Sequence, residues 1–217
     1  MRKQRVTVMK NKEKLISQII VRTFRKRLKK HLQREGIPDA AELCGRYEER
    51  FYSYMQAADM GEQGERFSSY LNIFSGLSAY EILREYGFDE QEGISAYDEM
   101  CAGYRKFASF LYKSVDRFSN GYGIVVKSLR EDLLGAKSVC WDTEIQRDDG
   151  KCFEYEISRC LYFDTCSEHG YPEFCKVFCT HDLYAFGVLG RHAVFERDSS
   201  IGEGGEVCHD RILKICK

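Results

Sequence analysis

The feature that most constrains the fold is a change of hydrophobic period near the middle of the chain. Before it, apolar side chains recur every three or four residues, which is typical of amphipathic helices. This pattern predicts helices over 13–34, 39–58, 66–86 and 93–116. The turn-forming cluster Ser119–Gly123 then interrupts the pattern.

After the interruption, the chain alternates between apolar and polar residues, as half-buried strands do. Strands are predicted over 139–145, 152–160, 192–198 and 206–215, with a hairpin turn at 148–150 and one helix over 172–186. The segment 124–134 fits either a helix or a strand. The order strand, strand, helix, strand, strand after a helical half predicts an α+β fold.

We therefore expect an N-terminal helical half that packs on a C-terminal antiparallel sheet with one central helix. The helical region would cover 1–118, and the cysteine-rich α+β region that carries the site would cover 119–217. A chain of 217 residues is short enough for both regions to form one compact unit.

Composition argues against several classes of partner. The formal net charge is -1, so no overall field favours nucleic acid or an acidic membrane. The basic cluster between Arg22 and Lys30 is typical of a solvated helix face. No stretch is apolar enough for an export signal or a membrane span, so we expect a cytoplasmic protein with reduced thiols. A homo-oligomer is compatible with this composition.

Eight of the ten cysteines lie after residue 139. Cys175, Cys179 and Asp182 are spaced i, i+4 and i+7, which places them on one face of the predicted helix. A helix N-terminus stabilises a thiolate, and a nearby carboxylate can transfer protons. The plainer alternative is that both cysteines are small core residues and that Asp182 faces solvent.

Two further segments contain candidate site residues. Cys208 follows Gly204 and Gly205, whose backbone amides could approach a ligand closely, although the glycines could equally form a simple hairpin tip. Cys160 ends an alternating strand beside Arg159, which could bind a substrate carboxylate through two hydrogen bonds or remain an exposed strand residue.

The cysteines and histidines also include the ligand types that zinc prefers. These are Cys160, Cys175, Cys179, Cys208, His181 and His209. The chain has no Cys-x-x-Cys pair and no His-Glu-x-x-His motif, so no metal ligand is assigned and zinc stays an option. Glycine-rich phosphate loops and the Gly-x-Ser-x-Gly motif are absent as well.

The region from Trp141 to Ile212 resembles the L-2-amino-thiazoline-4-carboxylic acid hydrolase family. The motifs that carry the resemblance are Phe153–Tyr162, Gly170–Phe174, Phe178–Asp182, Phe195–Arg197 and Ile201–Cys208. The resemblance implies a soluble bacterial enzyme that opens a small ring containing sulfur and nitrogen, with an N-carbamoyl cysteine as the product. The recurring positions of the family map to Cys160, Cys179, Asp182, Gly204 and Cys208.

One departure from the family pattern affects the predicted chemistry. The family continues its last cysteine as Cys-Asp-Phe-Arg, whereas this chain reads Cys208-His209-Asp210-Arg211. An acid next to the thiol is replaced by an imidazole. The base would then be His209 or Asp210, or the activity would be lost.

The leading hypothesis is a hydrolase that acts on the carbon–nitrogen bonds of a cyclic amidine such as 2-amino-thiazoline-4-carboxylate. Cys179 or Cys208 would attack the ring carbon, and Asp182 or His209 would handle protons. The substrate would bind Cys160, Arg159 and the amides of Gly204 and Gly205. In a variant of this mechanism, a cysteine-bound metal activates water. The alternatives are a non-catalytic sensor of a small molecule or metal, and an inactive relative.

Overall fold

The computed structural model describes residues 11–216, which fall into two compact units, one ending at Cys101 and one beginning at Ala102. The first unit consists of helices α1 (Asn11–Arg34), α2 (Ala40–Ala57), α3 (Phe67–Tyr86) and the first half of α4 (Glu90–Val115). The four helices predicted before residue 117 are thus confirmed.

The first unit has an aromatic core. Tyr47, Phe51, Tyr80 and Tyr97 are almost completely buried. Gly76 makes this packing feasible, because a Cβ atom there would lie 2.7 Å from the ring of Tyr97. Such aromatic stripes therefore serve as core in this unit, and they bury the large areas that stabilise small helical folds.

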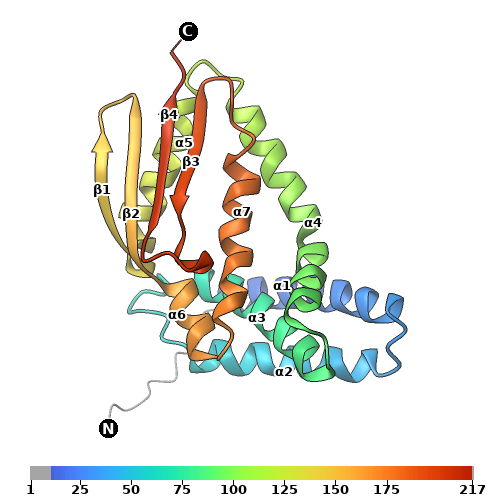
Figure 1. Cartoon of the computed structure of the whole chain (residues 1–217). Helices are drawn as coiled ribbons and strands as arrows, with labels where there is room; N and C mark the ends of the chain where they lie inside the picture. The colour runs from blue at the N-terminus through green and yellow to red at the C-terminus, as the bar shows by residue number, and fades with distance from the viewer. Residues whose placement is uncertain (1–10, 217) are drawn as a thin grey trace. The chain divides into compact units, whose positions relative to one another are not determined.

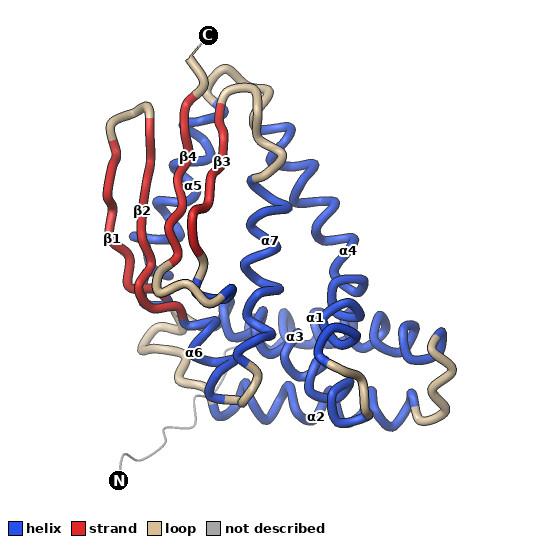
Figure 2. The backbone as a smooth tube through the Cα atoms, viewed as in Figure 1, coloured by secondary structure: helices blue, strands red, loops and turns tan. Residues whose placement is uncertain are grey.

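The second unit contains the end of α4, helix α5 (Gly121–Leu134), the short 3₁₀ helix η1 (Ala136–Cys140) and a four-stranded antiparallel sheet. The strands are β1 (Trp141–Asp148), β2 (Cys152–Cys160), β3 (Ala193–Ser199) and β4 (Cys208–Lys214). Between β2 and β3 lie α6 (Leu161–Glu168), the 3₁₀ turn η2 (Pro172–Cys175) and α7 (Lys176–Phe186), while η3 (Ile201–Glu203) precedes β4. Figures 1 and 2 show these elements along the chain.

The strand order is β1-β2-β4-β3, so the last strand of the chain lies between β2 and β3. In β4, residue Cys208 pairs with Ile157 of β2, and Asp210 pairs with both Tyr155 of β2 and Arg197 of β3. Side chains alternate across a strand, so Cys208 and Asp210 share one face of the sheet. This register fixes which residues can meet beneath the sheet.

Helix α5 covers that face (Figure 1) and supplies most of its apolar partners. The buried cluster comprises Tyr122, Val125, Val126, Leu129 and Leu133 of α5 together with Phe153, Tyr155, Ile157, Ala193, Cys208 and Ile212 of the sheet. The opposite face carries charged side chains. The alternation predicted from the sequence therefore reflects one buried and one polar face.

The α+β class, the helical N-terminal half and the C-terminal antiparallel sheet are confirmed. The helix predicted over 172–186 is present as η2 and α7, and the structure adds a shorter helix, α6, before it. Two helices, α6 and α7, connect β2 to β3, and the left-handed Gly170 (φ 82°) lies between them. Helix α6 has only eight residues, too few for a clear helical period. The ambiguous segment 124–134 forms part of α5.

Along the chain, the second unit begins within α4, at Ala102. The reason is that Tyr112 and Val115, in the last turns of α4, pack against the core of the second unit. Asp116, the next residue, accepts hydrogen bonds from four consecutive backbone amides of residues 190–193. These contacts attach the end of α4 to the start of β3.

No helix among residues 11–216 has the length and apolar character needed to cross a membrane.

Candidate functional site

Four cysteines meet where β2 gives way to α6 and where η2 gives way to α7. The thiols of Cys160, Cys166 and Cys179 lie close enough to Cys175 to raise the pKa of its thiol, and we call these four residues the cysteine cluster. Cys208 lies close enough to interact electrostatically with Cys160 and Cys179, and its sulfur accepts the backbone N–H of Ile201 at 3.3 Å. All are free thiols.

The cluster forms because two chain segments start helices at the same place. Cys160 is the N-cap of α6, and Cys175 immediately precedes the first residue of α7. The sequence predicted a single helix from 172, with Cys175 one turn inside it. In the structure this segment is divided: the 3₁₀ turn η2 (Pro172–Cys175) continues directly into α7, and Cys179 lies in the first turn of α7.

Cys160 and Cys179 are the two half-buried members of the cluster, and both have thiolate character. A hydrogen bond with Cys175 lowers the pKa of Cys160, and the backbone amides of Phe163 and Tyr162 lower it further. The corresponding bond lowers the pKa of Cys179 to about 7, against the effect of burial. These two thiols therefore ionise more readily than an ordinary cysteine, and the thiolate is the nucleophilic form of the side chain.

Cys175 and Cys208 have the opposite character. Hydrogen bonds to its three neighbours raise the pKa of Cys175, because its proton is shared with sulfurs that carry negative charge. Burial raises the pKa of Cys208 to about 11. Both stay protonated at neutral pH, so the arrangement favours Cys179 over Cys208 as the attacking thiol.

The lowered pKa of Cys179 predicts that this thiol reacts with alkylating agents at a lower pH than an ordinary cysteine does. The rate of alkylation of Cys179 by iodoacetamide should rise with pH through a midpoint near 7, whereas an unperturbed thiol has a midpoint near 9. Substituting Cys175 by alanine should move the midpoint upward, because the hydrogen bond that stabilises the thiolate is lost. Peptide mapping by mass spectrometry across a pH series measures this, and an unchanged midpoint in C175A would contradict it.

Arg197 holds α7 against the sheet. Its Nε and one terminal nitrogen bind the two carboxylate oxygens of Asp210 at 2.6 and 3.0 Å. The other terminal nitrogen donates to the backbone carbonyl of Cys179 at 2.9 Å. The hydroxyl of Tyr155 also donates to Asp210, at 3.2 Å. This buried group fixes the turn of α7 that carries Cys179.

Asp182 lies on the same side of α7 and accepts a hydrogen bond from Arg197 at 3.2 Å. Burial raises the pKa of Asp182 to about 6 even though Arg197 acts in the opposite direction. Its side chain is 51% exposed, however, and hydration through this opening favours the charged form and offsets part of the shift. Asp182 is thus a solvent-accessible carboxylate near Cys179, which suits proton transfer.

A pocket of about 480 Å³ opens beside the cysteine cluster. The four residues predicted to bind substrate, Arg159, Cys160, Gly204 and Gly205, all lie in its wall. The remaining lining residues are Ser158, Phe163, Asp164, Pro172, Glu173, Ile201, Gly202 and Glu206. Cys160 is therefore the member of the cluster that directly lines this pocket.

Gly202 lines the pocket and lies in close contact with the sulfur of Cys179. A Cβ atom at Gly202 would lie 2.7 Å from the sulfur of Cys179, so only glycine allows η3 to approach so closely. Ser200, just before η3, has a buried hydroxyl without a well-formed hydrogen bond, but it lies near enough to Cys179 to lower the pKa of that thiol. The glycine-rich loop therefore packs on the cysteine cluster, as a flexible hairpin tip would not.

The amides of Gly204 and Gly205 do not match their predicted role. The N–H of Gly204 donates to the carbonyl of Ile201 at 3.1 Å, and the N–H of Gly205 donates to the carbonyl of Ser200 at 2.9 Å. Both donors are used within the loop, so they cannot also stabilise a developing charge on a ligand. Gly204 has a left-handed backbone (φ 93°), which explains the glycine there.

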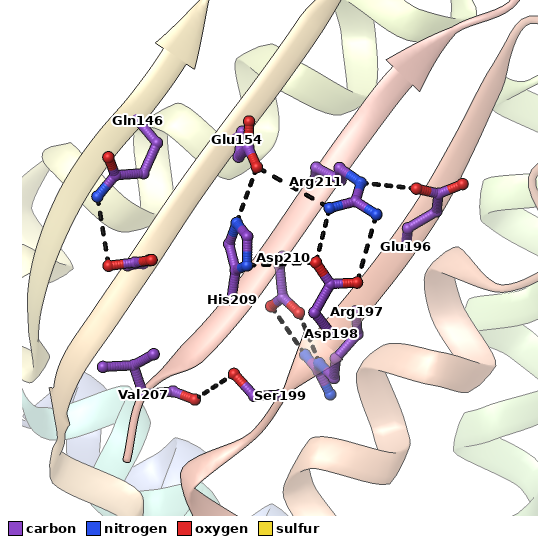
Figure 3. A network of polar contacts seen from close by, with 11 residues as sticks. Gln146, Glu154, Glu196, Arg197, Asp198, Ser199, Val207, His209, Asp210 and Arg211 are labelled. Carbon is purple, nitrogen blue, oxygen red and sulfur yellow. Dashed lines mark hydrogen bonds and ion pairs between the residues drawn. The ribbon is translucent and has the colours of Figure 1, made fainter. Parts of the chain in front are cut away.

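His209 is separated from the thiols by the sheet itself. Figure 3 shows His209 with Glu154 and Asp198 on the polar face, at 2.8 and 3.3 Å. Its neighbours Cys208 and Asp210 point to the buried face. The prediction that His209 handles protons for these cysteines is therefore not supported. Of the two bases suggested by the departure from the family motif, Asp210 is on the correct side.

Arg159 is already paired with acidic side chains. Its guanidinium binds both carboxylate oxygens of Asp142 at 3.0 Å each and approaches Asp164 at 3.5 Å. The hydrogen bonds with Asp142 raise the pKa of Arg159. The bidentate edge that was predicted to hold a substrate carboxylate is thus occupied by Asp142.

Within residues 11–216, no three cysteine, histidine or acidic side chains are placed to hold a metal ion. The Tyr155–Asp210–Arg197 group was not predicted from the sequence. Strand alternation was the available signal, since it places Asp210 with Cys208 and separates both from His209.

Fold and site together define a thiol-rich α+β protein in which a cluster of free cysteines lies beside an open pocket. A family model described as L-2-amino-thiazoline-4-carboxylic acid hydrolase matches residues 78–212, well over half of the chain. The chain therefore belongs to this family. Searches of curated proteins and of solved structures gave no match.

Proposed function

We propose that this protein hydrolyses a small cyclic amidine of the 2-amino-thiazoline type through a cysteine thiolate. The observation that carries the proposal is Cys160, which lines the pocket and is joined through the thiol of Cys175 to Cys179. Two low-pKa thiols beside a cavity suit nucleophilic catalysis. Family membership supports the same reaction class.

In the proposed reaction, the thiolate adds to the ring carbon between sulfur and nitrogen. The bond from this carbon to the ring sulfur then breaks, and the sulfur keeps the electron pair and takes a proton. Water adds to the resulting enzyme-bound isothiourea, the bond to the cysteine sulfur breaks, and the enzyme thiolate returns as the carbamoyl group forms. An N-carbamoyl cysteine keeps both nitrogen bonds, so a carbon–sulfur bond opens and not the expected carbon–nitrogen bond.

The neighbouring groups supply the proton transfers that this sequence of steps needs. Cys175 is a buried, protonated thiol beside both candidate nucleophiles, so it can stabilise the attacking thiolate, while the departing ring sulfur takes its proton from water in the open pocket. Asp182, with its pKa raised to about 6, can accept a proton from the attacking water. Arg197 binds both the backbone of Cys179 and the carboxylate of Asp182, which keeps the base near the nucleophile.

The test is turnover of 2-amino-thiazoline-4-carboxylate by Cys160→Ser and Cys179→Ser. Serine is not ionised near neutral pH, so loss of the true nucleophile should reduce kcat by at least about a hundredfold, the scale of other positioned catalytic groups. Cys216→Ser is the matched control, because Cys216 is an exposed thiol outside the cluster.

A covalent isothiourea adduct on one cysteine, detected by mass spectrometry after rapid acid quenching, would identify the nucleophile. Full activity in both C160S and C179S would refute thiol catalysis. Binding without turnover in the unmodified protein would instead favour the non-catalytic alternative.

A further inference from the structure

The cysteine cluster places a thiol that small solutes can reach beside thiols that they cannot. Cys160 is half-buried and lines the pocket, whereas Cys166 and Cys175 are almost completely buried. An accessible, readily ionised thiol next to a second thiol is the arrangement found in cysteines that respond to oxidants. The cluster therefore has the parts of an oxidisable pair.

Cys160 has the ionisation that such a pair requires. It is the N-cap of α6, where the first backbone N–H groups of a helix favour negative charge on sulfur. Its pKa lies below the ordinary value, mainly because of Cys175. Peroxides react with the thiolate, so Cys160 is the cysteine at which a peroxide in the pocket would react first.

Backbone geometry decides which thiol can then bond to Cys160. Cys166 lies six residues further along α6, a rise of roughly 9 Å, which is too far for a disulfide. Cys175 ends η2, a separate segment, so no helical spacing holds it away from Cys160. Cys175 and Cys179 are four residues apart in helical backbone, which keeps their Cβ atoms about 5–6 Å apart, whereas a disulfide needs about 3.5–4.5 Å.

We propose that a hydroperoxide converts Cys160 and Cys175 into a disulfide, which reversibly inactivates the site. The thiolate of Cys160 attacks a peroxide oxygen, the oxygen–oxygen bond breaks, and Cys160 becomes a sulfenic acid as hydroxide or alkoxide leaves. The sulfur of Cys175 then attacks that of Cys160, the sulfur–oxygen bond breaks, and the hydroxyl leaves with the thiol proton as water. The two thiols lose two electrons, and the peroxide gains them.

The consequence for turnover rests on the proposed function. The disulfide removes Cys160 as a nucleophile, and it removes the Cys175 thiol that favours the thiolate of Cys179. Turnover of 2-amino-thiazoline-4-carboxylate should therefore fall in proportion to the disulfide formed and should return after treatment with dithiothreitol.

The test treats the full chain with a small molar excess of hydrogen peroxide, blocks the remaining thiols with iodoacetamide and maps the peptides without reduction. Cleavage after Glu168 and after Lys176, by a glutamate-specific protease and trypsin, separates Cys175 from both Cys160 and Cys179. A cross-link between the peptides that contain Cys160 and Cys175 is expected in the unmodified protein.

Serine variants assign the two steps of the oxidation. C175S should form no such cross-link and should accumulate a sulfenic acid at Cys160, which dimedone traps. C166S and C179S are the matched controls, because each keeps both partners and should still form the cross-link. A cross-link that persists in C160S, a bond between Cys175 and Cys179, or oxidation of Cys160 to the sulfinic acid while Cys175 stays reduced would overturn the proposal.

Peptide mapping does not depend on activity, so the two proposals fail separately. If the cross-link forms but the thiazoline is never hydrolysed, the proposed function fails and the modification stands. If turnover depends on a cysteine but peroxide leaves Cys160 and Cys175 reduced, the proposed function stands and this inference fails.

Discussion

Replacing Arg197 by methionine is expected to lower the free energy of unfolding by about 3–5 kcal/mol, as when one partner of a buried ion pair is removed. Arg197 and Asp210 are only 9% and 3% exposed, and they share two hydrogen bonds. Without Arg197, the carboxylate of Asp210 stays buried beneath the sheet and keeps only the hydroxyl of Tyr155 among these partners. The carbonyl of Cys179 also loses its donor, so the reactive thiols should become more mobile.

Arg211→Met is the matched control for this prediction. Arg211 binds Glu196 and Asp198 on the polar face of the same strand pair, and its side chain is 28% exposed. Solvated ion pairs contribute about 0–1 kcal/mol, so the control should lose little stability. Urea denaturation followed by circular dichroism measures both variants, and similar losses in the two would show that burial of Arg197 is not what matters.

Asp116→Asn is expected to cost about 3 kcal/mol of stability, because several buried donors then lack a charged acceptor. The carboxylate is 4% exposed and accepts the N–H groups of four successive residues at 2.6–3.0 Å. An asparagine offers one carbonyl oxygen, and its amide group would face N–H donors instead of accepting from them. The segment before β3 should then detach from the end of α4.

The pH dependence gives a second readout for Asp116. Burial alone would raise its pKa, but the four backbone N–H groups outweigh this and lower it. Its stabilising contribution is therefore fully present above its ordinary pKa of about 4 and is lost as the pH falls towards the lower folded value. D116N should flatten this part of the stability profile. Asp132→Asn, at an exposed carboxylate paired with Lys137, should leave the profile unchanged.

Much of the fold follows from local patterns. Helical periods predicted the four helices before residue 117 within a few residues, and alternation predicted the strands and the hairpin at 148–150. Helix α6 was missed because eight residues between a strand and a glycine turn show too little periodicity. The placement of β4 between β2 and β3 depends on long-range pairing, which no local pattern contains.

The site could be predicted in part for the same reason. Spacing brought Cys175 and Cys179 together, and the family motifs included Cys160 and the glycine loop. The role of a side chain that depends on contacts with residues of other helices or strands could not be predicted from local sequence patterns. The sequence predicts a substrate contact for Arg159 because no local pattern reveals its pairing with Asp142. It also places His209 beside Cys208 in the chain, but neighbours on a strand face opposite sides of the sheet.

The position of β4 also affects how the protein is made. During synthesis β2 and β3 leave the ribosome before Cys208–Lys214. Strand β2 can pair with β1 on one edge, but its other edge, and the paired edge of β3, wait for β4. Until then the nascent chain exposes open strand edges, which are prone to pair with other chains. Solubility during expression should therefore be sensitive to temperature and to chaperone supply even when the finished protein is stable.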